Sequence, residues 1–505
     1  MDRLHPSTLS KLPADIARPR YPREALRAGI VHLGVGAFAR AHFAVATEAA
    51  LHSGGELRWG IVGASLRRRD THEALAPQSG LYTVALRNAA DGVAAPEPLQ
   101  VVGALTQVLV ASDDPGAVLA RIAHADTRIV SLTVTEKGYH RDPASGALQL
   151  DDPDIQHDLA HFQTPRTAIG FLVRGLHLRM QRERAPVTLL SLDNLPANGH
   201  TLRSLVLAFA EHVDSGLHAW ILSRCTFPNS VVDRIVPRTS DGDRERISHR
   251  LGVRDAWPVV AESYGDWVVE DRFAAGRPDW EAGGTRFVQK AEPFERLKLR
   301  MVNGSHSALA YLGAMAGLKT VDQAIGVHAL NRFLDALMRE EIAPTLPSLP
   351  GVSLDSYRAR LLQRFANPTL QHRTCQIAMD GSQKLPQRLL DTVRDRLRAN
   401  ASFERLALAV AAWTHYLRGI DETGQRYEIE DPLAPALAQQ MARAEDAAAG
   451  VPDSMSAERR RIEVFSAFKP VFGELGSEPR FVEALARHTL SLRQRGVLLT
   501  AARAA

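Results

Sequence analysis

Short apolar runs recur along the first half of the chain, and stretches with helical spacing lie between several of them. The apolar runs fall at residues 29–33, 59–63, 82–86, 99–102, 127–135 and 187–192, and each has the length and character of a strand. Helical spacing is found at residues 38–51, 114–123 and 165–182. Strands that alternate with helices predict a parallel, doubly wound sheet.

The pattern changes near residue 290, where the strand signal fades. Helical spacing then covers residues 305–317, 321–341, 355–365, 383–398, 402–418, 432–447, 456–472 and 478–495. The predicted fold class is therefore α/β, with a Rossmann-type doubly wound sheet domain at 1–290 and a mainly α-helical domain at 291–505. Residues 295–306 would lie at the junction of the domains, where ligand sites are common.

Composition and charge limit the possible partners. The chain has 505 residues, with 61 basic and 57 acidic side chains and a net charge of +4, so its charges are close to balanced and do not suit nucleic-acid binding. The two cysteines, Cys225 and Cys375, provide neither a disulfide framework nor metal-ligand spacing. We see no secretory signal and no run of about 18 apolar residues. We expect a cytoplasmic protein with no nucleic-acid or membrane partner.

A glycine turn follows the first predicted strand directly. Gly34 and Gly36 stand between the strand at 29–33 and the helical stretch that begins at Phe38. Glycine lets the backbone approach a pyrophosphate closely, and the N–H groups at the start of a helix favour an anion. Ala39 stands where the usual third glycine would be. The turn therefore indicates a dinucleotide, although strand-G-x-G is a weak signal by itself.

Polar residues follow three more of the predicted strands. The segment after the second strand holds three arginines, 67–69, and then Asp70. A carboxylate there would bind the adenosine ribose of NAD, whereas arginines would accept the 2′-phosphate of NADP, so the residues leave both cofactors open. Glu136 follows the strand at 127–135, and Asn194 follows the strand at 187–192. Ligands of open α/β sheets collect at these carboxyl ends.

The stretch 295–306 carries the clearest candidate chemistry. On an α-helix, Lys298, Asn303 and His306 would fit within an arc of about 140°. A lysine can move a proton, an amide can polarise a carbonyl, and a histidine can fix a hydroxyl, which together suit the reversible oxidation of an alcohol. The alternative is an ordinary capped helix with a solvated lysine.

Two other functions, that of a zinc enzyme and that of a redox sensor, would depend on other residues. His157 and His161 have the i, i+4 spacing of a zinc-protease helix, but an aspartate replaces the usual glutamate and no third ligand is evident. We therefore expect no metal. A dinucleotide-binding redox sensor without catalysis would keep Gly34, Gly36 and Asp70. It would not need Lys298, Asn194, Asn303 and His306 together, so their joint presence favours an enzyme.

Five segments together resemble the polyol-specific long-chain dehydrogenase family, that of mannitol 2-dehydrogenase and fructuronate reductase. They occur in the family's order at residues 30–42, 131–139, 191–196, 231–237 and 298–306, and the resemblance extends from about residue 28 to about residue 495. It implies a metal-free oxidoreductase that acts on CH–OH groups with NAD(H) or NADP(H). The implied cofactor-binding residues are Gly34, Gly36, Phe38, Arg40, Asp70 and Glu136. Asp70 stands where the family's NAD-selecting aspartate lies, so the resemblance favours NAD.

The same resemblance implies the catalytic roles. Lys298 would be the general acid/base, Asn194 and Asn303 would hold the substrate oxygen, His306 would bind a hydroxyl, and Glu295 would relay the proton. Lys298 can accept a proton near neutral pH only if its pKa is lowered from about 10.4. We expect burial, Arg300 or the positive nicotinamide to lower it.

The substrate depends on finer features. Residues 367–386 resemble the fructuronate reductase branch, and Gln376 stands where we expect an arginine in mannitol dehydrogenases. Lys384 matches a substrate-side lysine of both branches, and Asp233 is a further implied substrate contact. Arg373 or its neighbour His372 could hold a sugar-acid carboxylate, although Arg373 could equally form an ordinary ion pair. We predict D-mannonate/D-fructuronate, with D-mannitol/D-fructose or a D-arabinitol-type polyol as the alternative. The resemblance suggests a monomer or a weak homo-oligomer.

Overall fold

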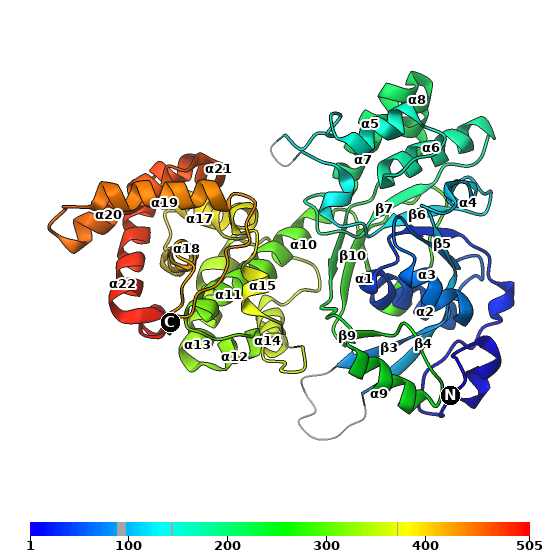
Figure 1. Ribbon diagram of the computed structural model, residues 1–505, viewed down its shortest axis with the longest axis horizontal. Helices are drawn as coiled ribbons and strands as arrows, with labels where there is room; N and C mark the ends of the chain where they lie inside the picture. The colour runs from blue at the N-terminus through cyan, green and yellow to red at the C-terminus, as the bar shows by residue number, and fades with distance from the viewer. Residues whose placement is uncertain (88–96, 143–144, 371) are drawn as a thin grey trace. The chain divides into compact units, whose positions relative to one another are not determined.

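The computed structural model describes residues 1–87, 97–142, 145–370 and 372–505. The chain divides into two compact units, Met1–Glu295 and Arg296–Ala505, which are coloured from blue to green and from green to red in Figure 1. The first contains the strands, and the second is helical, so the predicted fold class is confirmed.

A parallel five-stranded sheet forms the centre of the first unit. Its order is β5-β2-β1-β6-β7, and its strands are β1 (Ile30–Leu33), β2 (Ile61–Ser65), β5 (Leu105–Val110), β6 (Ile129–Leu132) and β7 (Thr188–Ser191). All four neighbouring pairs are parallel. β1, β6 and β7 are buried along their whole length, so their few polar side chains, such as His32 and Ser131, are buried as well.

Helices cover both faces of this sheet, as Figure 1 shows for α6 and α7 on one side and α1 and α2 on the other. Val31 and Leu33 of β1 pack in the core formed with α4, α6 and α7, whereas Ile30 faces the core that contains α2. The helices of this unit are α1 (Ala37–Ala41), α2 (Phe43–His52), α3 (Asp70–Leu75), α4 (Pro115–Ile122), α5 (Pro153–Ala160), α6 (Ala168–Gln181), α7 (Asn198–Val213), α8 (Ser215–Arg224) and α9 (Asp241–Leu251), and α10 (Glu292–Leu297) spans the boundary.

Two predicted strands do not belong to the parallel sheet. β3 (Tyr82–Arg87) and β4 (Leu99–Val102) pair antiparallel with each other, and β3 pairs with β9 (Val259–Glu262) in a separate sheet. A third sheet, β8 (Ser230–Asp233), β10 (Asp266–Glu270) and β11 (Arg286–Val288), was not predicted, nor was β5.

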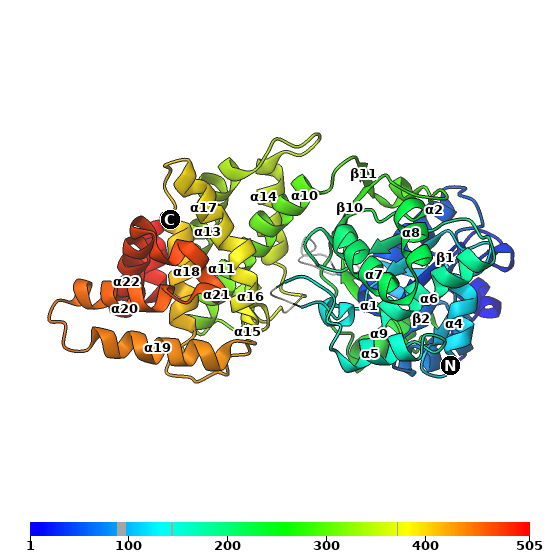
Figure 2. The same ribbon diagram turned by 90° about the horizontal axis from the view of Figure 1, so that it is seen from above.

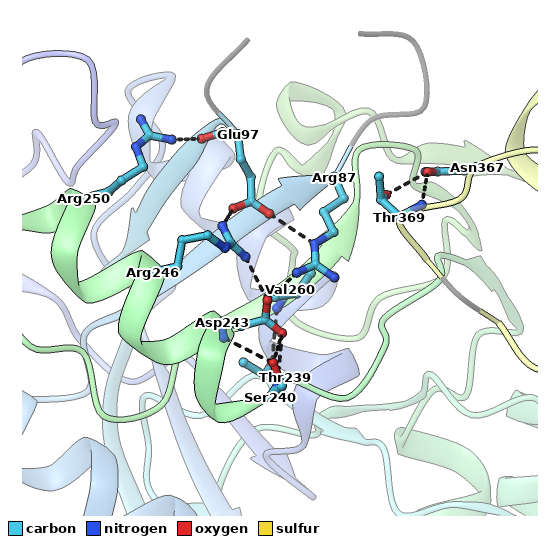
Figure 3. Close-up of polar contacts among 10 residues, drawn as sticks. All are labelled: Arg87, Glu97, Thr239, Ser240, Asp243, Arg246, Arg250, Val260, Asn367 and Thr369. Carbon is cyan, nitrogen blue, oxygen red and sulfur yellow. Dashed lines mark hydrogen bonds and ion pairs between the residues drawn. The ribbon is translucent and has the colours of Figure 1, made fainter. Parts of the chain in front are cut away.

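An ionic cluster joins β3 to α9 (Figure 3). Arg87 at the end of β3 pairs with Glu97 and with Asp243 of α9. Arg246, one turn further along α9, pairs with the same two carboxylates. Two guanidinium groups therefore share two carboxylates, and together they fix the positions of residues 87 and 97.

The second unit is built around α11 (Ser305–Met315) and α18 (Glu404–Tyr416), which pack against each other and are buried on nearly every side. The surrounding helices are α12 (Val321–Gly326), α13 (His328–Ala336), α14 (Leu354–Phe365), α15 (Thr374–Ala378), α16 (Gly381–Leu385), α17 (Asp391–Arg398), α19 (Ala434–Ala448), α20 (Ser454–Ser466), α21 (Lys469–Phe472) and α22 (Pro479–Ala504). Figure 2 shows α19 and α20 running side by side. No helix in the described part of the chain is long and apolar enough to span a membrane.

Several predicted helices are interrupted. The stretch 38–51 breaks at His42, between α1 and α2, and 456–472 breaks between α20 and α21. Three π-helical segments, Lys298–Gly304, Leu337–Ile342 and Pro386–Leu390, continue neighbouring α-helices. The apolar spacing that predicts a helix does not reveal these changes in hydrogen-bond register.

Candidate active site

The predicted dinucleotide residues lie at the carboxyl edge of the parallel sheet. Leu33, the last residue of β1, pairs with Ala64 of β2 on one side and with Leu132 of β6 on the other. The strand order reverses between β1 and β6, and such a switch point is where open α/β sheets bind ligands. Gly34 follows β1 directly, Glu136 begins the short 3-10 helix after β6, and Asn194 lies in the segment after the neighbouring β7.

The glycine turn contains two glycines with different constraints. Gly34 has φ +91°, and a Cβ there would lie 2.1 Å from the carbonyl oxygen of Thr133, in the segment after β6. Only glycine fits this position. Gly36 has an ordinary extended backbone, with φ −78°, and the nearest atom to a Cβ there would be 4.0 Å away. Its backbone faces open space, as close approach of a ligand requires.

Asp193 joins the segments that follow β6 and β7. Its carboxylate accepts hydrogen bonds from the N–H groups of Val134 and Thr135, both at 3.0 Å, and from the Tyr139 hydroxyl at 2.8 Å. Burial raises the pKa of Asp193, and these three donors oppose that shift. The contacts set the backbone path next to Glu136 and Asn194. Asp193 was not predicted as a site residue, although its place before Asn194 was a usable signal.

Glu295 contacts the same region of the first unit. Its two carboxylate oxygens lie 3.0 and 3.3 Å from the amide nitrogen of Ala197, which donates to them. Ala197 has φ 43° and precedes α7, in the segment that carries Asn194. The carboxylate therefore holds a strained turn three residues from Asn194. Its proposed proton relay stays a prediction.

Each arginine after β2 has a carboxylate partner. Arg67 pairs with Asp154 at 2.8 Å, Arg69 pairs with Asp113 at 2.8 Å, and Arg68 pairs with Asp70, the first residue of α3. All three guanidinium groups are exposed, so these pairs are weak. A 2′-phosphate would nevertheless have to compete with a carboxylate for each of them.

A cavity of about 450 Å³ is lined in part by Arg67. Leu66 and Arg67 from the end of β2 and Ala111 and Ser112 from the end of β5 form one wall. Residues of the α5–α6 region, including Phe171, form the other. Its position at the carboxyl ends of two parallel strands gives it the surroundings of a ligand pocket.

Three other residues of this unit, predicted to contact the cofactor or the substrate, lie next to other residues of the protein. Arg40 is 5% exposed, donates to the carbonyl oxygen of Trp257, and lies 5.3 Å from the centre of the Tyr82 ring. Its side chain is thus used inside the protein, which does not favour its predicted cofactor contact. Phe38 stacks on the His42 ring at 5.0 Å. Asp233 ends β8, opposite Asp266 of β10.

The candidate acid/base segment of the second unit has a different geometry from the predicted α-helix. Lys298–Gly304 is a π-helix, and His306 follows it in α11. Because π-helical hydrogen bonds join residues five apart, Lys298 and Asn303 come close to one line along the helix. The predicted separation of about 140° is therefore wrong for these two residues. The π segment aligns the proposed acid/base with the proposed amide more closely than an α-helix would.

His306 lies in a ring-lined site within the second unit. Its ring stacks on Phe365 at 4.7 Å and meets His372 edge to face at 5.1 Å. No described residue hydrogen-bonds to its buried Nε2 atom. Burial holds the pKa of His306 well below its ordinary value, and nearby His372, Arg388, Arg364 and Lys384 lower it further. The neutral ring can therefore exchange a hydrogen bond with a ligand hydroxyl.

Lys384, Arg373 and Arg300 of this unit were also predicted to take part in the site. Lys384 donates to the carbonyl oxygen of Met379 at 2.7 Å and lies 3.4 Å from Asp380. Arg373 is exposed at the start of α15. Arg300, expected to help lower the pKa of Lys298, is buried and pairs with Asp395 at 2.6 Å. That carboxylate offsets much of the positive charge of Arg300.

Comparison with known proteins identifies the family. Sequence profiles of the mannitol dehydrogenase Rossmann domain and the mannitol dehydrogenase C-terminal domain match residues 28–282 and 290–492. The chain belongs to the mannitol dehydrogenase family. It is accordingly an oxidoreductase that acts on CH–OH groups, and the resemblance seen in the sequence is confirmed.

The relatives in this family differ in substrate. The D-mannonate oxidoreductase of Escherichia coli is 44% identical over 428 residues, which are 84% of this chain and 86% of that protein. Mannitol dehydrogenase DSF1 of Saccharomyces cerevisiae is 41% identical over 438 residues, 86% of each chain. The mannitol 2-dehydrogenase of Pseudomonas fluorescens, solved as a ternary complex with NAD and D-mannitol, is 36% identical with a TM-score of 0.84, and the match covers 99% of both chains.

Among the residues that the structure describes, His157 and His161 are not part of a group with metal-ligand spacing. The one group with metal-ligand spacing in the described residues is His140, Asp152 and Asp154, and it contains neither His157 nor His161. His157 instead contacts Asp158 at 3.1 Å. Asp152 caps the start of α5, and Asp154 pairs with Arg67, so both carboxylates have structural partners.

Proposed function

We propose that this member of the mannitol dehydrogenase family is an NAD-dependent secondary-alcohol dehydrogenase that interconverts D-mannonate and D-fructuronate without a metal. The observation that carries the chemistry is the π-helix that aligns Lys298 with Asn303 and leads directly to His306. The 44% identity to a D-mannonate oxidoreductase supports the sugar acid. The alternative is D-mannitol and D-fructose, favoured by the likeness to an enzyme solved with D-mannitol.

The surroundings of the glycine turn fit NAD. Gly34 and the open backbone at Gly36 suit a pyrophosphate, and Asp70 at the start of α3 suits the adenosine ribose. The cavity beside Leu66 and Ala111 suits the adenine end. The carboxylate of Asp70 favours NAD over NADP, and the related enzyme solved with NAD supports this choice. When bound, NAD would supply the hydride acceptor for oxidation of the substrate alcohol, and NADH the hydride donor for the reverse reaction.

The protein's residues would move the proton and stabilise the charge. In oxidation, Lys298 takes the proton of the substrate hydroxyl; in reduction, protonated Lys298 returns it. Asn194 and Asn303 donate hydrogen bonds to the same oxygen as it gains negative charge, which is worth about 3 kcal/mol per donor at an oxyanion. His306 holds a neighbouring hydroxyl, and Glu295 passes the proton from Lys298 toward water. Residues 1–290 would bind the dinucleotide, and 291–505 would supply the acid/base.

The test is the initial rate of NADH oxidation by the purified protein with D-fructuronate and with D-fructose, repeated with NADPH. We expect a higher kcat/KM for D-fructuronate and a preference for NADH. A preference for D-fructose would support the mannitol alternative, and turnover of neither substrate would refute both. The proposed substrates are small molecules; a monomeric or weakly associated state and a cytoplasmic location stay predictions.

A further inference from the structure

Two imidazole rings of the second unit lie edge to face, and each has one buried ring nitrogen without a hydrogen-bond partner among the described residues. His306 and His372 lie 5.1 Å apart at an interplanar angle of 73°. In the described part of the chain, nothing hydrogen-bonds to the buried Nε2 of His306 or to the buried Nδ1 of His372. A buried polar atom without a partner is costly, and a ligand that supplies oxygen atoms would remove this cost.

Positively charged side chains surround His306. Arg388 donates from its guanidinium to Ser307, the residue after His306, at 3.0 Å. Burial is the main cause of the lowered His306 pKa, and the charges of Arg388, Arg364 and Lys384 add to it. Burial also lowers the pKa of His372, so both rings are neutral donors or acceptors. A sugar alcohol carries no charge that would use these cations, whereas a sugar acid does.

The backbone holds these groups in place. Gly304, directly before α11, lies against the segment that carries Arg388: a Cβ on Gly304 would be 2.6 Å from the Arg388 carbonyl oxygen. The His372 carbonyl accepts the N–H of Val321 at 3.0 Å. These contacts fix Arg388 and His372 relative to His306 without using the His372 side chain. A change of that side chain should therefore leave the local backbone intact.

We propose that His372 and Arg388 bind the carboxylate of the sugar-acid substrate, next to the hydroxyl held by His306. The inference rests on the proposed function and assigns its substrate specificity to two residues. A guanidinium can bind a carboxylate with two hydrogen bonds, and the imidazole adds a third donor. The exposed Arg373, which the sequence suggested for this role, would not take part.

The experiment compares His372→Leu with the adjacent control Arg373→Leu, using D-fructuronate and D-fructose as substrates. Hydrogen bonds to charged groups contribute about 1.5–3 kcal/mol, so His372→Leu should raise KM for D-fructuronate roughly 10- to 100-fold. Its kcat/KM for D-fructose and its Kd for NADH should stay within about twofold of wild type. Arg373→Leu should resemble wild type with both substrates. His372→Asn, which keeps an amide near the position of Nδ1, should recover part of the lost affinity.

Arg388 is tested by a conservative change. Arg388→Lys keeps the charge but loses the paired donors, and should raise KM for D-fructuronate more than KM for D-fructose. If wild type reduces D-fructuronate and His372→Leu does so unchanged, or if Arg373→Leu carries the loss, the inference is wrong while the proposed function stands. If both substrates are affected equally, His372 is structural and the inference is also wrong. If wild type does not reduce D-fructuronate, the proposed function itself fails.

Discussion

Replacing Gly34 and Gly36 in turn by alanine separates the structural requirement of the glycine turn from its proposed contact with NADH. At Gly34 the added methyl would lie 2.1 Å from the Thr133 carbonyl oxygen, with the backbone at φ +91°. A carbon and an oxygen normally stay about 3.3 Å or more apart, so the segments after β1 and β6 must separate by about 1 Å. The left-handed backbone costs about 1–2 kcal/mol and the overpacking about 1–3 kcal/mol. Gly34→Ala should lower the unfolding free energy by about 2–5 kcal/mol.

Gly36→Ala is the matched control for stability. Its φ of −78° suits alanine, and the new methyl would be 4.0 Å from the nearest atom. We expect the unfolding free energy of Gly36→Ala to lie within about 0.5 kcal/mol of the wild-type value. If the pyrophosphate approaches this backbone, the methyl should still raise Kd for NADH about tenfold or more, because it occupies that space.

The assays are urea unfolding followed by tryptophan fluorescence and NADH binding by titration. Trp59, Trp267 and Trp280 are buried in the core beside β1, so they report on this unit. Gly34→Ala as stable as wild type would refute the steric argument. Gly36→Ala with unchanged NADH affinity would refute the placement of the pyrophosphate.

Two further predictions concern charged groups. Asp70→Ala should raise KM for NADH about tenfold, because the ribose loses its carboxylate partner. The ratio of kcat/KM for NADH to kcat/KM for NADPH should also fall, because Arg68 loses its ion pair with Asp70. If this ratio is unchanged, Asp70 does not select NAD. At Asp243 of α9, partial burial raises the carboxyl pKa, but hydrogen bonds from Ser240 and the charges of Arg246 and Arg87 outweigh it and lower the pKa to about 2. The ionised Asp243 carboxylate should therefore stabilise the folded protein above about pH 4, and this stabilisation should be lost as the pH falls toward 2. Asp243→Asn should therefore flatten the acid side of the stability profile, and an unchanged profile would contradict the lowered pKa.

The main sheet could be predicted from the sequence because its central strands are buried on both faces. The runs at 29–33, 127–135 and 187–192 are rich in apolar and β-branched residues and are therefore distinct. β3 and β4 are equally apolar, but their partner β9 lies far along the chain, and no local pattern shows which sheet a strand joins. For the same reason the third sheet was not predicted.

The candidate site was only partly predictable. Gly34 could be predicted from neighbouring residues alone, because this glycine directly follows a predicted strand. The π-helical register at Lys298–Gly304 has none, since it depends on tertiary packing such as that of Gly304 against Arg388. The sequence also could not show that the Arg40 side chain, predicted to contact the cofactor, packs on Tyr82. His372 and Arg388 become candidates only when folding brings them to His306.

The most direct test of the lysine mechanism is kcat for D-fructuronate reduction by Lys298→Ala at saturating NADH. Loss of the general acid should lower kcat roughly 10²- to 10⁴-fold. The Kd for NADH should stay within about twofold, and Lys290→Ala, which changes an exposed lysine, should match wild type in both measurements. If Lys298→Ala retains the kcat of wild type, Lys298 is not the acid/base and the account is contradicted.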